Sequence, residues 1–185
     1  MSKHVTAPAL AVDVRELLLR PGAHKHVVVR APLEDLATPV ASVPPDRPVT
    51  VDAEVESVVE GLLVTGTVSA TAVVRCVRCL REFDQDLEVE VRELFALAPG
   101  DEEDEGYAVL PGDRLPLDTM ARDALVLGFP ASPLHSPDCA GLCPVCGADR
   151  TTTDCGHGDP EPIDPRWAGL AGLTLQEEDD ARPQA

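Results

Sequence analysis

Aromatic side chains are scarce in this chain: only 3% of its 185 residues are Phe, Trp or Tyr. Hydrophobic residues still make up 44% of the sequence, so valine, leucine and alanine must fill the core, which favours β structure. No run approaches the roughly 18 consecutive apolar residues of a membrane span. The first residues also lack an apolar export signal, so we expect a cytoplasmic protein with no membrane partner, in which structural disulfides are rare.

Motifs of the common enzyme classes are missing as well. The sequence contains no H-E-x-x-H, G-x-S-x-G, P-loop or G-x-G-x-x-G. Its five histidines are scattered along the chain, whereas a catalytic zinc ion needs an open coordination position and a nearby general base. We therefore expect no enzyme, no catalytic residue and no small-molecule substrate.

Basic residues are outnumbered, with 15 Lys and Arg against 33 Asp and Glu, for a net charge of −18. Much of the excess lies in residues 84–105 and after Asp159. A surface of this sign repels nucleic-acid phosphates and attracts basic proteins. Acidic runs can also serve only to solvate a surface, and the sequence leaves both interpretations open.

Alternation of apolar and polar residues predicts most of the secondary structure. Strands are expected over residues 26–33, 51–59, 64–74 and 86–92, with tight connections between the last three. Val59 is placed on the apolar side of the second of these strands. The pattern is typical of an antiparallel meander, and it leaves open whether the sheet closes into a barrel.

Helices are expected over residues 13–22, 115–130 and 163–173. The middle one carries an amphipathic stripe of Leu117, Met120, Ala121, Ala124 and Leu125. The predicted fold class is α+β: an antiparallel β meander, open or barrel-like, with peripheral helices and a C-terminal cysteine-rich zinc-knuckle module. The predicted domains are a β-rich body (1–130), the cysteine-rich segment (131–160), and a docking helix with an acidic tail (161–185).

Four of the six cysteines lie within residues 139–155. Residues 131–158 contain too few apolar side chains to offset the entropy lost on ordering. A structural zinc ion contributes roughly 10–16 kcal/mol. The thiols are therefore expected to replace a hydrophobic core by binding Zn²⁺.

Two ligand sets fit the spacing of the cysteines. The first joins all four cysteines of the C-terminal segment, with His157 as a substitute for the last of them: Cys139, Cys143, Cys146 and Cys155. The second set joins the two C-x2-C pairs, Cys76/Cys79 and Cys143/Cys146, as zinc ribbons do. Unliganded thiols and redox pairs are the remaining alternatives.

Three arginines surround the first pair, which is expected at a hairpin end: Arg75, Arg78 and Arg81. They either stabilise thiolates and neighbouring carboxylates or form a small contact point for RNA phosphate.

Four elements in order resemble the YceD family of bacterial and plastid proteins: "CVRCLREF" (76–83), the helix that precedes "GFP" (128–130), "GLCPVCG" (141–147) and D-P-R-x-A-G-L-A (164–171). The resemblance runs from about Asp13 to Leu173. It implies a role in accumulation of large-subunit ribosomal RNA, and a gene that often precedes that of a small zinc-ribbon ribosomal protein. It brings no established catalytic residue.

Together these observations predict a non-catalytic factor that assists large-subunit RNA or ribosome assembly. Its expected partners are a basic large-subunit ribosomal protein, ribosomal RNA, or both. Two alternatives are a zinc-dependent nuclease acting on precursor ribosomal RNA, which would need His157 or Asp154, and a purely structural adaptor.

Overall fold

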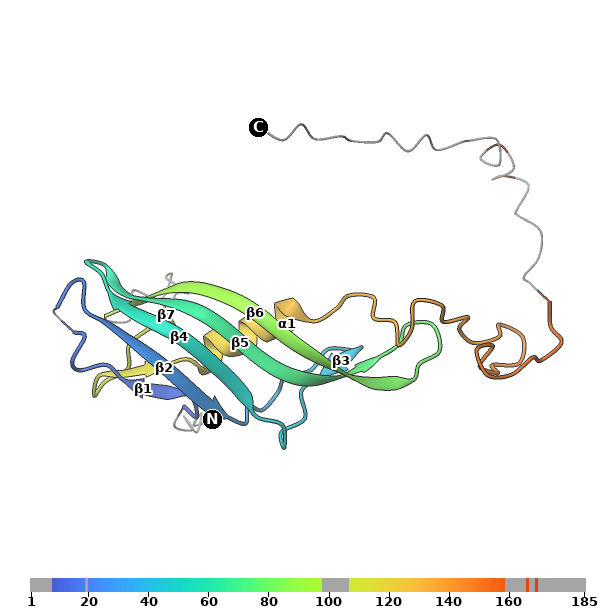
Figure 1. The fold of residues 1–185 in the computed structure, drawn as a ribbon, viewed down its shortest axis with the longest axis horizontal. Coiled ribbons are helices and arrows are strands. Elements are labelled where there is room, and N and C mark those ends of the chain that lie inside the picture. Colours follow the sequence, from blue (N-terminus) through green and yellow to red (C-terminus); the bar gives the residue numbers. More distant parts are fainter. Residues whose placement is uncertain (1–7, 19, 98–106, 159–165, 167–168, 170–185) are drawn as a thin grey trace, which may run out of the picture.

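The computed structural model describes residues 8–18, 20–97, 107–158, 166 and 169. A six-stranded sheet is its main element (Figure 1). The strands are β2 (His24–Ala31), β4 (Val49–Ser57), β5 (Gly61–Arg75), β6 (Glu82–Ala96) and β7 (Tyr107–Ala108) in spatial order, with β3 (Ala41–Ser42) paired to β5. A second sheet joins β1 (Ala11–Asp13) to β8 (Arg114–Pro116), and α1 (Asp118–Gly128) follows.

The predicted antiparallel meander is confirmed in β4, β5 and β6. Consecutive strands of this meander pair antiparallel, and the β5–β6 ladder runs without a break from Gly61↔Ala96 to Arg75↔Glu82. Apolar residues of β4 such as Val51 are buried, and polar ones such as Asp52 are exposed. Alternation along the chain therefore fixed which face of the sheet turns inward.

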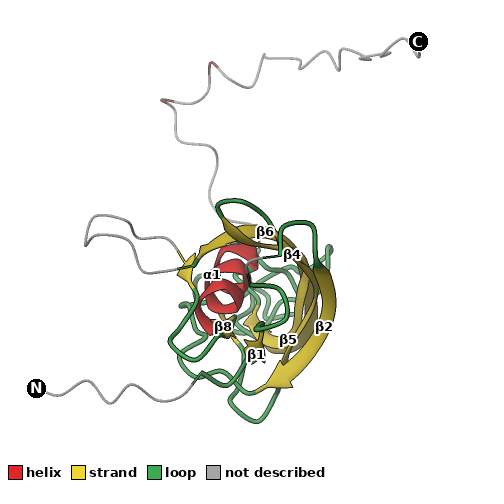
Figure 2. Ribbon diagram, turned by 90° about the vertical axis from the view of Figure 1, so that its left-hand side faces the viewer, coloured by secondary structure: helices red, strands yellow, loops and turns green. Residues whose placement is uncertain are grey.

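Helix α1 lies on the inner face of the sheet, which curves around it (Figure 2). Met120, Ala121 and Leu125 are buried there, as the stripe predicted. Near the C-terminal end of β6, Phe95 is fully buried and stacks on Tyr107, with the ring centroids 5.1 Å apart. The core thus relies on aliphatic side chains, with this aromatic pair and Phe129.

The sheet does not close into a barrel. The strands at its two edges, β2 and β7, pair with β4 and β6 and not with each other. Closure is unnecessary for burial, because α1 and neighbouring loops already cover the apolar face. The barrel-like alternative is therefore wrong.

The helix expected over residues 13–22 is wrong too. Asp13 ends strand β1, opposite Arg114, and the described residues from there to Gly22 form turns and irregular backbone. Val14 and Leu17 are buried in the core from these turns. Pairing with β8 outweighed the helical pattern of a segment this short. Helix α1 is the only α-helix in the described ranges, and the helix predicted over 163–173 lies outside them apart from two residues.

Strand β4 ends two residues earlier than predicted. Val59, expected on the buried side, lies in the turn before β5 and is 83% exposed.

Among the described residues, no helix has the length and apolar character to span a membrane.

The β5–β6 hairpin is long enough to reach beyond the core. Its end lies beside the segment that follows α1 (Figure 1), where the Val77 amide donates a 3.0 Å hydrogen bond to the Pro133 carbonyl. This contact brings the first cysteine pair next to the C-terminal cysteine segment.

Candidate metal centres

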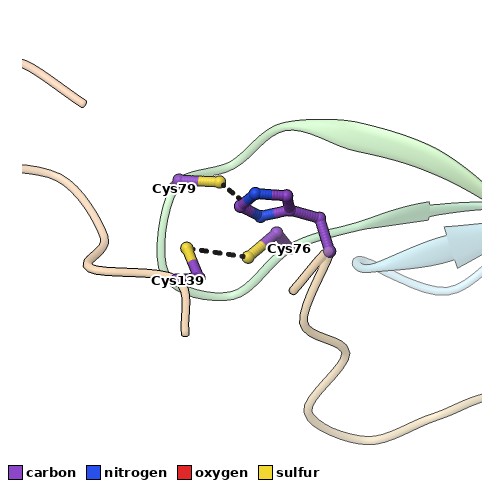
Figure 3. A group of neighbouring side chains, drawn as sticks. Cys76, Cys79 and Cys139 are labelled. Carbon is purple, nitrogen blue, oxygen red and sulfur yellow. Dashed lines mark hydrogen bonds between the residues drawn. The ribbon is translucent and has the colours of Figure 1, made fainter. Parts of the chain in front are cut away.

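The first candidate centre combines the hairpin end with the segment after α1. Cys76 and Cys79 come from the turn between β5 and β6, while His135 and Cys139 come from the later segment. One ligand atom from each of the four residues lies within 4.8 Å of the other three. Figure 3 shows the three thiols converging on one point. Three sulfurs and one imidazole nitrogen are a donor set typical of structural zinc.

The sulfur atoms are close without being bonded. Cys76 Sγ is 3.8 Å from Cys139 Sγ, and Cys79 Sγ is 3.2 Å from His135 Nδ1 (Figure 3). A disulfide requires about 2.05 Å, so these are free thiols. The three cysteines are at most 8% exposed and form a small core of their own with Leu134.

Hydrogen bonds within the cluster shift the acidity of its thiols. Burial of Cys76 opposes ionisation, but hydrogen bonds from the His135 side chain and from backbone amides, that of Cys79 first among them, lower its pKa to about 5. The pKa of Cys79 is raised, first by burial and then by the neighbouring sulfurs, despite a backbone hydrogen bond from Arg81. A thiolate at Cys76 is the form that binds a cation at neutral pH.

The second candidate centre is local in sequence. Cys143, Cys146, Cys155 and His157 place one ligand atom each within 4.8 Å of one another. Cys143 is buried, whereas Cys146 and His157 are exposed and Cys155 is half-buried. This centre therefore lies closer to solvent than the first.

Both centres contain the same turn. Leu80 N donates to Cys76 O at 2.9 Å, and in the second centre Gly147 N donates to Cys143 O at 2.8 Å. Each turn closes with a bond from its first cysteine's amide to the carbonyl five residues on, that of Arg81 or Ala148. The two C-x2-C pairs are therefore two copies of one zinc-knuckle backbone, in separate centres.

In the second centre, too, one thiol has a lowered pKa and another has a raised pKa. Backbone hydrogen bonds from Cys146 and Val145 lower the pKa of Cys143 to about 6. The pKa of Cys146 is raised. A backbone hydrogen bond from Ala148 lowers it, but the Cys143 side chain, burial and the Cys155 side chain together outweigh that bond. One thiolate per centre is thus favoured by hydrogen bonds, from the His135 side chain and backbone amides in the first centre and chiefly from backbone amides in the second.

Neither predicted ligand set is assembled as written. The structure groups Cys139 with the hairpin pair, and it keeps the two C-x2-C pairs in different centres. Long-range packing decided this, because the Val77–Pro133 contact brings Cys139 to the hairpin. His157 joins Cys155 instead of replacing it.

His135 is the candidate ligand that sequence reasoning missed. It precedes Cys139 by four positions, a short His–Cys spacing that mirrors the close spacing of ligands in zinc sites. If each C-x2-C pair needs two further donors to reach four, the six cysteines are too few, and histidines such as His135 must complete the sets.

The three arginines around the first pair all have partners within the protein. Arg75 pairs with Glu82 at 3.2 Å, where the β5–β6 ladder ends at the turn. Arg78 Nη1 donates to the Cys139 carbonyl at 3.0 Å. These contacts fit the stabilising interpretation of the arginines.

The third arginine, Arg81, connects the two centres. It forms a 2.9 Å ion pair with Asp149, which lies in the second centre's loop. A backbone hydrogen bond from Thr151, aided by this arginine, lowers the pKa of Asp149. The hairpin end thus contributes ligands to the first centre and contacts the loop of the second.

The cysteines lie in the part of the chain that a known protein family shares. The profile of the family described as "Large ribosomal RNA subunit accumulation protein YceD" matches residues 64–174, which include all six cysteines. Uncharacterized proteins of Mycobacterium tuberculosis and Mycobacterium bovis are each 38% identical over 97% of this chain and 88% of their own length. One from Mycobacterium leprae is 33% identical, over 92% of this chain and 80% of its own. No solved structure matches. The chain belongs to the YceD family.

Proposed function

We propose that this protein is a non-catalytic factor for accumulation of large-subunit ribosomal RNA, whose C-terminal half is held together by two structural zinc ions. One observation carries the proposal: the six cysteines and two histidines form two separate groups of four donors. The family description supplies the ribosomal context.

The donor geometry supports zinc. In a tetrahedral site with Zn–S bonds of about 2.3 Å, two sulfurs lie about 3.8 Å apart. The Cys76–Cys139 separation of 3.8 Å has this value. Thiolate and imidazole ligands also favour zinc over magnesium or calcium, which prefer oxygen.

A structural role is favoured over a catalytic one. Each group already offers four protein donors, and a closed tetrahedron leaves no position for a reactive water. The nuclease alternative would need one donor of the exposed group, such as His157, to leave the metal. The first centre, with its thiols buried, is the less suited of the two.

The ribosomal partner is proposed to be a basic protein of the large subunit. A net charge of −18 disfavours general binding to RNA, because affinity for RNA depends on neutralising phosphates. Any direct contact with ribosomal RNA through Arg75, Arg78 and Arg81 would have to compete with the internal partners of these side chains.

Three measurements test the proposal. Native mass spectrometry of protein purified without chelator should show two zinc ions per chain, and none would contradict the metal assignment. Gradient sedimentation of cell extracts should place the protein with large-subunit precursors. Cleavage of precursor RNA by the purified protein, abolished by chelator, would instead establish the nuclease.

A further inference from the structure

The outer face of the main sheet, opposite α1, carries a trough. It is defined by Asp52 and Glu54 of β4, Thr65, Thr67 and Ser69 of β5, and Glu88 of β6. These residues line a hollow of about 470 Å³. No described element covers this side of the sheet (Figure 2).

The register of the strands builds the trough. Asp52 lies opposite Thr67, and Glu88 lies opposite Ser69, so small hydroxyl side chains of β5 run between carboxylates on both sides. Adjacent strands are about 4.8 Å apart, which puts the two carboxylate rows about 10 Å from each other. Short side chains between long ones give a groove with an acidic rim.

Carboxylates outnumber cations around the trough in the described residues. Asp52 is 2.7 Å from His26 Nε2, but no ion pair is formed there by Glu54 or Glu88. Glu90, opposite Thr67, adds a further carboxylate to the β6 row, and Arg92, opposite Thr65, ends that row with a cation. An excess of carboxylates on this surface produces a negative electrostatic potential, which attracts a cationic segment.

We propose that this trough binds an extended Lys/Arg-rich segment of a partner protein. An extended chain fits a groove bounded by strands, and its cationic side chains reach the carboxylates on either side. The β5 hydroxyls supply hydrogen-bonding groups beneath it, which a purely solvated acidic face would not need. A nucleic acid is disfavoured by the same charges.

This inference rests on the proposed function, because the partner is taken to be the basic large-subunit protein proposed there. The inference adds the surface of this chain that the partner would bind. It concerns the sheet face and is independent of zinc. The trough and the two centres involve different residues.

Binding of a labelled peptide to the full-length, zinc-loaded protein tests the inference. A peptide of about ten residues alternating Arg and Gly covers the trough at about 3.3 Å per residue. We expect saturable binding by fluorescence anisotropy, weakened by salt. The variant D52N/E54Q/E88Q keeps the side-chain shapes and should bind about tenfold more weakly.

A matched variant separates the trough from overall charge. E34Q/D46N/E60Q removes the same number of charges from exposed residues that do not line the hollow. It should bind within about twofold of the unchanged protein. Equal weakening by the two variants, no binding at all, or a preference for an RNA oligonucleotide would overturn the inference.

Sedimentation keeps this outcome distinct from that of the proposed function. A protein that sediments with large-subunit precursors but does not bind the peptide contradicts the trough alone. One that binds the peptide through the trough but never sediments with these particles contradicts the ribosomal role alone.

Discussion

Leu80 and Gly147 occupy the same place in two copies of one turn. Each follows the second cysteine of a C-x2-C pair, and each donates its amide to the first cysteine's carbonyl. Both have left-handed backbones, with φ of 60° at Leu80 and 73° at Gly147. Glycine adopts this conformation freely, but leucine does so at a cost of about 1–2 kcal/mol. The first knuckle therefore keeps its shape despite strain.

Substitution at these two positions should have different effects on stability. G147A is expected to lower the free energy of unfolding by about 1 kcal/mol, although its Cβ would meet no atom within 4 Å. L80G should cause no loss, because it removes the strained leucine, whose side chain is 57% exposed. Urea unfolding with zinc present measures both. G158A, at another open glycine without a left-handed backbone, is the control.

Loss of His135 should remove one metal ion. H135A leaves the first centre with three thiols, so bound zinc should fall from two ions per chain to one. H135C restores a fourth donor and should keep two. H24A, which changes a histidine outside both centres, should also keep two. Native mass spectrometry counts the ions, and two ions in H135A would contradict the first centre.

The single tyrosine of the chain should titrate late. Burial of Tyr107 and its 2.8 Å hydrogen bond to Asp123 raise the phenol pKa from 10.0 to about 12. Because the folded pKa is the higher one, this stabilisation is complete below pH 10 and is lost as pH rises through about 12. Ultraviolet absorbance of the phenolate follows the titration. D123N should move the midpoint toward 10.0, and an unchanged midpoint would contradict the contact.

Chelation of zinc should loosen the cysteine segment but leave the sheet intact. Hydrogen exchange in residues 131–158 should accelerate at least tenfold, because little apolar packing remains there without metal. Strand β4 and helix α1 should keep their protection. As a local comparison, C155S should expose residues 140–158 while residues 133–139 stay protected. Loosening of the whole protein by chelator would show that the body depends on the metal.

The sequence by itself determined the meander and α1. Val51, Val64 and Val68 alternate with polar neighbours, and this local pattern leaves one way to bury each strand. The spacing of the cysteines likewise indicates both C-x2-C pairs without any information about their positions in space. Such features depend on residues that are close in the chain, so the sequence is sufficient to predict them.

Only the tertiary structure decided which donors meet. Cys76 and Cys139 are 63 positions apart, and they come together because the β5–β6 hairpin extends to the segment after α1. A separate long-range pairing, with β8, likewise places Asp13 in a strand instead of a helix. A ligand set depends on contacts between distant segments, and spacing along the chain cannot rank those contacts.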